Sequence, residues 1–241
     1  MALKRVWIPS PNYSSRGGAK VRLIVLHTAE GARTYQSLGS FFGSSSSGVS
    51  SHTGIDDTAN TVGEYVARGS KAWTQGNANP VAVSAELCAF ANWSIAEWNK
   101  HPNMLANAAA WVAEEAAALG IPIVRLNATQ AQGSGRGVCQ HIDLGKWGGG
   151  HVDCGPNFPM DRVLEMAKGG STPTPTPPPE TYRGDQLFIR NSNVVYQLIY
   201  NGAGSYWRSI PAAAASRIPT SWIIADDGGT WLSLWQVGAP K

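Results

Sequence analysis

Cysteine, charge and long apolar runs are all scarce in this chain of 241 residues. Its three cysteines cannot all pair, so we expect no disulfide framework and synthesis in a reducing compartment. Lysine and arginine are scattered and the net charge is only +3, which argues against a nucleic-acid partner. No apolar run has the length of a membrane span, and the first residues lack the apolar segment of a signal peptide. We therefore expect a soluble chain made in the cytoplasm, without a membrane partner.

A Pro/Thr-rich stretch divides the chain. Residues 170–181 contain STPTPTPPPE, an extended and semi-rigid composition that is typical of a linker. Before it, residues 1–169 mix strand-like and helix-like patterns, which predicts an α/β domain with a central mixed β-sheet flanked by helices. After it, residues 182–241 carry short aromatic and β-branched runs separated by Asn-Gly and Asp-Gly-Gly turns, which predicts a small β-rich module.

Two apolar runs of the first domain carry polar residues that stand out. Residues 21–27, VRLIVLH, predict a strand buried on both faces, and His27 falls at its end, where α/β proteins place their sites. A buried histidine satisfied by the backbone is the alternative interpretation of His27. Residues 82–90, AVSAELCAF, form a second run that is interrupted by Glu86. A carboxylate in an apolar strand is costly unless it is paired, hydrogen-bonded or facing a cavity, so Glu86 is a candidate functional residue.

Further elements follow from local patterns. Thr34 is expected to cap a short amphipathic helix, and a longer helix is expected over residues 103–119. In the longer helix, Glu114 and Glu115 are expected on the solvated face. Residues 121–126, IPIVRL, are expected to form another buried strand.

Metal-capable and nucleophile-capable side chains crowd together in residues 137–160, GVCQHIDLGKWGGGHVDCGPNFPM, namely His141, Asp143, His151, Asp153 and Cys154. The interleaved glycines allow the backbone to fold tightly around a small object such as a metal ion. Catalytic zinc sites usually take one ligand from a distant part of the chain, and His27 is the natural candidate. His52 is expected to be structural or pocket-lining rather than a ligand.

Four motifs, in the order LIVLHTAEG, VAVSAELCA, GVCQHIDLG and HVDCGPNFPM, resemble those of a known family. The chain is similar over residues 5–168 to the zinc-dependent N-acetylmuramoyl-L-alanine amidases of the peptidoglycan-recognition-protein fold, especially phage endolysins. This resemblance implies a zinc ion held by His27, His141 and Asp153.

The chain departs from the family pattern at two positions. Where the family has Asp-Pro-Gly, Cys154 follows Asp153, so a second candidate ligand stands beside the first; register favours Asp153. Where similar enzymes often carry Lys or Thr, the chain has His151, which is expected to stabilise the transition state or transfer a proton. The alternative makes His151 a ligand in place of His141. Asp143 is expected to orient His141 or a turn.

The resemblance also implies a reaction. Zinc with three protein ligands lowers the pKa of a bound water molecule to about 7. Glu86 would take the proton of this water as it attacks the amide between N-acetylmuramic acid and L-alanine, and His151 would help to stabilise the oxyanion. Two alternatives stay open, a peptidoglycan-binding protein without activity and a zinc peptidase that cuts within the stem peptide.

The expected partner is bacterial peptidoglycan. The β-rich module could add binding to a wall polysaccharide, because it is tethered by a linker and rich in aromatic residues, among them Tyr206, Trp207, Trp222, Trp231 and Trp235. We expect a monomer, made in the host cytoplasm without a signal peptide and acting on the cell wall. The host, its wall chemistry and a phage or bacterial origin stay open.

Overall fold

The computed structural model describes residues 3–169, 188–191, 194–200, 205–210 and 223–225. The chain separates into two compact units, Met1–Thr176 and Pro177–Lys241. The predicted linker over residues 170–181 lies outside the described residues.

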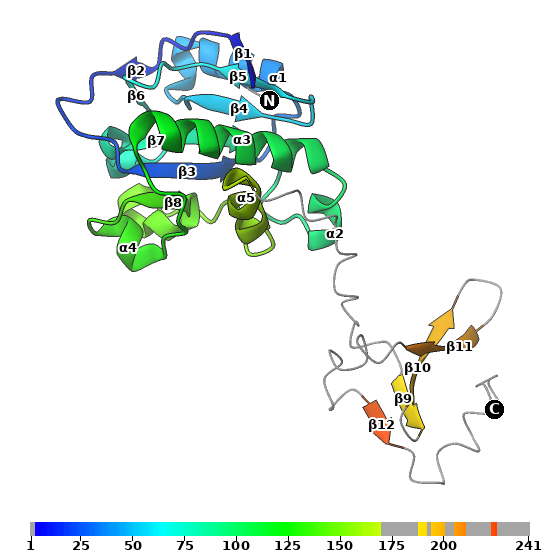
Figure 1. Ribbon diagram of the computed structural model, residues 1–241. Coiled ribbons are helices and arrows are strands. Elements are labelled where there is room, and N and C mark those ends of the chain that lie inside the picture. Colours follow the sequence, from blue (N-terminus) through cyan, green and yellow to red (C-terminus); the bar gives the residue numbers. More distant parts are fainter. Residues whose placement is uncertain (1–2, 170–187, 192–193, 201–204, 211–222, 226–241) are drawn as a thin grey trace. The chain divides into compact units, whose positions relative to one another are not determined.

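The first unit is built on a six-stranded sheet with the order β1-β5-β4-β7-β3-β8 (Figure 1). Its strands are β1 (Lys4–Trp7), β3 (Leu23–Thr28), β4 (Thr53–Ile55), β5 (Thr61–Glu64), β7 (Ala82–Leu87) and β8 (Gly137–Gln140). Only β4 and β5 pair antiparallel among these strands, and the other pairs are parallel. The predicted mixed sheet is therefore confirmed.

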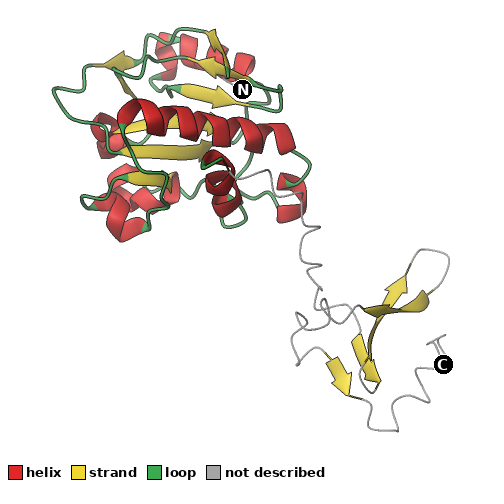
Figure 2. Cartoon of the chain, viewed as in Figure 1, coloured by secondary structure: helices red, strands yellow, loops and turns green. Residues whose placement is uncertain are grey.

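Helices and short connecting elements surround this sheet (Figure 2). The α-helices are α1 (Tyr35–Gly43), α2 (Ile95–Trp98), α3 (Pro102–Leu119), α4 (Ala128–Gln132) and α5 (Met160–Ala167). Short 3-10 helices are η1 (Ser45–Ser47), η2 (Gly76–Val81) and η3 (His141–Gly148), and β2 (Tyr13–Ser14) pairs with β6 (Lys71–Ala72). Thr34 caps α1 as predicted, since its side chain accepts from the N–H of Ser37. In the described part of the chain, no helix is long and apolar enough to cross a membrane.

Strand β3 separates the two sides of the core. All six of its residues are buried, as the continuous apolar run predicted. Ile24 and Leu26 pack in the larger cluster with α3 and α5, and Figure 1 shows α3 lying across β3 and β7. Leu23 and Val25 pack in a smaller cluster on the other face. Because side chains alternate along a strand, His27 lies on the face of the smaller cluster, away from α3.

Residues 121–126 do not form the predicted strand. Pro122 has no N–H to donate to a ladder, and Val124 is 45% exposed. The segment meets β8 at Val138, whose N–H donates to the Val124 carbonyl and which forms an isolated bridge with Arg125. The prediction was wrong because an apolar run does not reveal whether regular backbone pairing is available.

Glu115 is buried rather than solvated, which corrects the expectation for α3. Its carboxylate accepts from Arg5 Nη2 at 3.0 Å and from Arg68 Nη2 at 2.9 Å. Glu114 is partly exposed and also pairs with Arg5, at 2.9 Å. Two arginines distant in sequence thus satisfy a carboxylate that helical periodicity alone assigns to solvent.

The described part of the second unit is a four-stranded sheet with the order β11-β10-β9-β12. Its strands are β9 (Phe188–Asn191), β10 (Val194–Tyr200), β11 (Ser205–Ile210) and β12 (Ile223–Ala225). Strand β10 pairs antiparallel with β9 and β11, whereas β12 pairs parallel with β9. These elements agree with the predicted β-rich character.

Candidate active site

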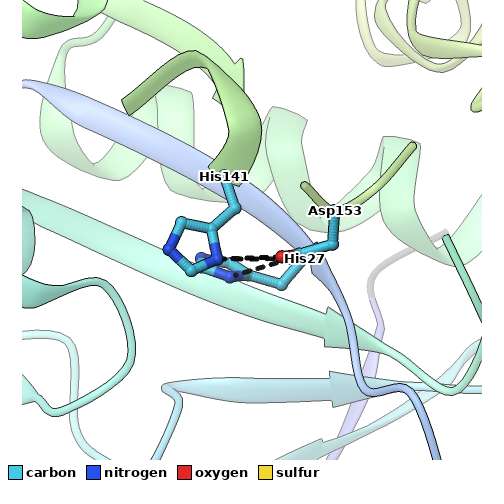
Figure 3. A group of neighbouring side chains, drawn as sticks. All are labelled: His27, His141 and Asp153. Carbon is cyan, nitrogen blue, oxygen red and sulfur yellow. Dashed lines mark hydrogen bonds and ion pairs between the residues drawn. The ribbon is translucent and has the colours of Figure 1, made fainter. Parts of the chain in front are cut away.

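Three buried side chains from distant parts of the sequence converge beside the sheet (Figure 3). His27 comes from β3, His141 follows directly after β8, and Asp153 lies in the loop before α5. One ligand atom of each residue lies within 4.8 Å of the others. The parallel pairing of β3 with β8 brings the two histidines together, because Leu26 pairs with Gln140 and these residues directly precede His27 and His141.

Both imidazoles direct Nδ1 at the same carboxylate, as the dashed lines in Figure 3 show. His27 Nδ1 lies 3.4 Å from Asp153 Oδ2, and His141 Nδ1 lies 3.1 Å from Asp153 Oδ1. The two rings are tilted, with centroids 4.3 Å apart. The backbone N–H of Thr28 donates to Asp153 Oδ2 at 3.3 Å, which ties the loop to the end of β3.

The other ring nitrogens decide which tautomer each histidine adopts. His141 Nε2 lies 2.8 Å from the carbonyl oxygen of Gly148, which can only accept, so this nitrogen carries the hydrogen. His27 Nε2 lies 2.9 Å from Gln75 Oε1 and donates in the same way. In the neutral rings, both Nδ1 atoms therefore present lone pairs to the Asp153 carboxylate. These lone pairs and the carboxylate repel one another unless a cation or added protons lie between them. A metal-binding histidine usually donates a hydrogen bond from its other ring nitrogen, as both Nε2 atoms do here.

Asp153 is ionised in this environment. Burial alone would raise its pKa, but when His141 and His27 carry protons on Nδ1, their hydrogen bonds and positive charge hold the pKa of Asp153 well below its usual range. One carboxylate and two imidazoles form a donor set that zinc accepts, and three protein ligands are typical of a catalytic zinc site.

Glu86 stands beside this group on β7, opposite His27 in the strand register. Its Oε1 lies 3.7 Å from His27 Nδ1 and accepts from Thr74 Oγ1 at 2.9 Å. Burial raises the pKa of Glu86 above its ordinary value, against the opposing charge of His27. Glu86, the acidic residue that interrupts an apolar run, thus faces the side of the sheet that carries His27.

His151 is exposed and lies against the edge of the group. Its ring stacks on the ring of His141, with centroids 4.6 Å apart and planes at 16°. The three side chains that converge, called the convergent set below, are His27, His141 and Asp153, and they do not include His151.

Cys154 packs away from the convergent set. Its side chain is fully buried in the larger hydrophobic cluster, and burial raises the pKa of the thiol well above its ordinary value. Cys88 and Cys139 are also buried, and all three are free thiols. The geometry therefore brings Asp153, rather than its neighbour, to the histidines.

Asp143 and His52 form hydrogen bonds with backbone groups. Asp143 accepts from the N–H of Gln140 at 2.9 Å, so it orients the turn that begins η3. His52 is buried, with Nδ1 accepting from the Ser84 N–H at 3.1 Å and Nε2 3.1 Å from the Ser70 carbonyl. Burial and the nearby charge of Arg16 lower the pKa of His52 to about 3, so it is a neutral structural residue.

Sequence reasoning did not find Thr74 and Gln75, which contact Glu86 and His27. Thr and Gln are common in loops, and their spacing from the histidines is not periodic. The sequence TQGN after Trp73 carries no signal that distinguishes it from an ordinary turn.

A family model described as N-acetylmuramoyl-L-alanine amidase matches residues 17–156, more than half of the chain. Among the curated proteins, none gives a significant match. The hydrolase AmiA of Staphylococcus aureus has a similar fold, with a TM-score of 0.53, 18% identity, and coverage of 72% of this chain and 88% of AmiA. The endolysin amidase LysCS from Clostridium intestinale has a TM-score of 0.51 and 15% identity, with coverage of 71% of this chain and 99% of LysCS. The family match includes β3, β7, β8 and the loop with Asp153, whereas the edge strand β1 lies outside it.

Proposed function

Since the chain belongs to the N-acetylmuramoyl-L-alanine amidase family and hydrolyses peptidoglycan, we propose that it works with a zinc ion held by His27, His141 and Asp153. The observation that carries this proposal is the direction of the donor atoms. Two imidazole Nδ1 atoms and a carboxylate face one another, while Gln75 and Gly148 hold both Nε2 atoms. When bound, the ion would supply Lewis acidity that polarises the scissile carbonyl and lowers the pKa of a water molecule.

Glu86 is proposed as the general base. Its Oε1 lies 3.7 Å from His27 Nδ1, beside the atoms that would hold the ion, so the carboxylate could take a proton from a water molecule there. The carboxylate would take a proton from the attacking water and return it to the leaving nitrogen of L-alanine. The bond that breaks is the amide between the lactyl group of N-acetylmuramic acid and L-alanine.

His151 is proposed to act on the substrate rather than on the metal. Its exposed ring stacks on His141, so a substrate carbonyl near the group would lie within its reach. An N–H of His151 would donate to the carbonyl oxygen as negative charge develops there, or pass a proton to the leaving group.

The products distinguish the proposed cleavage from other cuts. Mass spectrometry of digested cell walls should show stem peptides with a free L-alanine amino terminus. A zinc peptidase would instead leave L-alanine attached to the glycan and cut further along the peptide. Release of no peptide by the zinc-loaded protein would contradict the proposed activity.

Zinc content tests the choice between two neighbouring residues. Asp153→Ala should lose zinc and activity, because it removes the carboxylate that both histidines face. Cys154→Ser should keep one zinc per chain, because its side chain packs in the apolar cluster. Loss of zinc from Cys154→Ser alone would shift the ligand register by one residue.

We further propose an endolysin role, in which the protein acts on the bacterial cell wall as a monomer. The basis is the organisation of the chain, an amidase unit followed by a Pro/Thr-rich stretch and a β-rich unit over residues 182–241. This second unit is proposed to bind a wall polysaccharide. Sedimentation of inactive Glu86→Gln protein with purified walls, before and after removal of the wall polysaccharide, measures this binding.

A further inference from the structure

We infer that Thr74 and Gln75 form a clamp that positions the two catalytic functions of the site, Glu86 and His27. The inference rests on the proposed function, because it assigns roles relative to a zinc ligand and a general base. Both residues lie between β6 and η2, outside the motifs that carry the family resemblance. Their side chains hold groups on two different strands.

Gln75 supports the metal ligand. Its Oε1 accepts from His27 Nε2 at 2.9 Å, and its side chain is almost fully buried. This contact fixes the tautomer of His27, because a hydrogen on Nε2 leaves the Nδ1 lone pair directed at Asp153. An oxygen acceptor on the far nitrogen also raises the basicity of the ring as a ligand.

Thr74 supports the carboxylate. Its Oγ1 donates to Glu86 Oε1 at 2.9 Å, which is the oxygen that lies 3.7 Å from His27 Nδ1. A hydrogen bond at this oxygen fixes the rotation of the carboxylate about its last torsion. Thr74 therefore determines how Glu86 faces the reacting water, without touching the substrate.

A single side chain holds both residues of the clamp. Asn79 Oδ1 accepts from the N–H of Thr74 at 3.1 Å and from the N–H of Gln75 at 2.8 Å. The carbonyl of Asn79 accepts in turn from Arg16 Nη1 at 3.1 Å. Asn79 thus holds the backbone of Thr74 and Gln75, and Arg16 holds Asn79. A catalytic site needs such supporting hydrogen bonds to keep its geometry fixed.

The hydrogen bonding of Gln75 favours a functional role over simple packing. Its Nε2 is buried and has no hydrogen-bond partner within the described part of the chain. An unsatisfied buried donor is unfavourable, so an apolar side chain would serve stability better at this position. The carboxamide is explained by the acceptor that it offers to His27.

Zinc affinity tests the Gln75 half of the clamp. Gln75→Met keeps the side-chain length but removes the acceptor, and it should weaken zinc binding about 10-fold in competition with a chromophoric chelator. Gln75→Glu keeps an acceptor and should bind zinc at least as tightly as the wild type. If Gln75→Met does not fold, Gln75→Asn withdraws the acceptor and should show the same loss. Wild-type zinc affinity in whichever of these two variants folds would overturn this role.

Steady-state kinetics test the Thr74 half. Thr74→Val is nearly isosteric and lacks the hydroxyl, so kcat should fall about 10-fold while KM and zinc affinity stay near the wild-type values. Thr74→Ser retains the hydroxyl and should restore most of kcat. A kcat that is the same in Thr74→Val and Thr74→Ser would overturn the assignment.

Two controls separate this inference from the proposed function. Ser84→Ala removes a buried hydroxyl on β7 that contacts Ser51 at 2.9 Å, so it should lower thermal stability without changing zinc affinity. His27→Ala tests the proposed function itself. If His27→Ala loses zinc while Gln75→Met does not, the clamp is wrong and the zinc site stands. If His27→Ala keeps zinc, both fail.

Discussion

Two buried histidines flank the same strand, and only their surroundings distinguish them. His27 on β3 and His52 before β4 lie on opposite sides of β7 in the sheet. His27 meets Glu86 and Asp153, whereas His52 meets serine and backbone groups and lies 2.9 Å from an Arg16 nitrogen. Burial alone does not make a histidine functional. The charge and the acceptors around the ring decide it.

The pKa values of the two residues move in opposite directions for this reason. Burial lowers both, but the charges of Glu86 and Asp153 raise the pKa of His27 above its ordinary value. For His52, the charge of Arg16 adds to the effect of burial, and its pKa falls to about 3. A cation is attracted to the surroundings of His27 and repelled from those of His52.

The largest effect is expected from removal of His27. His27→Ala should lose zinc and reduce peptidoglycan hydrolysis by about 10⁴-fold or more, since a catalytic metal supplies several kcal/mol of transition-state stabilisation. Metal analysis and peptide release from walls check this on the same sample. His52→Asn is the matched control and should keep its zinc. Equal zinc content in the wild type, His27→Ala and His52→Asn would contradict the assignment of His27 as a zinc ligand.

A smaller effect is expected when the base next to His27 is changed. Glu86→Gln keeps the shape of the side chain and the oxygen that accepts from Thr74. Hydrolysis should fall by about 10²- to 10⁴-fold with zinc still bound, because the amide cannot take a proton. A variant that loses zinc together with activity would show that Glu86 supports the metal instead of acting as a base.

The smallest expected effect concerns the second histidine and is seen only as pH-dependent stability. His52 stays neutral in the folded protein, with a pKa of about 3, while the unfolded chain takes up the proton near pH 6.5. The free energy of unfolding should therefore fall as the pH drops from about 6.5 toward 3. At pH 5 the contribution is on the order of 2 kcal/mol.

Urea unfolding at pH 7 and pH 5 measures this term. The wild type should lose about 2 kcal/mol more than His52→Asn between the two values, because the other titrating groups are common to both proteins. The same loss in both proteins would mean that His52 is not held neutral in the fold.

Much of the architecture followed from patterns along the chain. The apolar runs that became β3 and β7 predicted buried strands, and Thr34 predicted the start of α1. These predictions succeeded because each depends on neighbours in sequence. Residues 121–126 show the limit, since an apolar run containing Pro122 packs beside β8 without forming a strand.

Contacts between distant segments could not be predicted in the same way. Glu115 has the helical spacing of a solvated residue, but Arg5 and Arg68 approach it from far away in sequence. Gln75 is likewise an ordinary loop residue until the fold brings it to His27. No periodicity encodes either contact.

By itself, the sequence determined the α/β class of the first unit, the metal-capable residues and the isolated carboxylate on β7. Residue type and apolar pattern suffice for these, because strand burial and side-chain chemistry are local properties. The choice of His27, His141 and Asp153 among the metal-capable residues came from the family resemblance. Only the tertiary structure decided which donors meet. Parallel pairing of β3 with β8 and β7 brings His27 to His141 and Glu86, and the loop before α5 turns Asp153 toward them while Cys154 packs into the core. These choices depend on long-range backbone pairing, which the order of residues along the chain does not display.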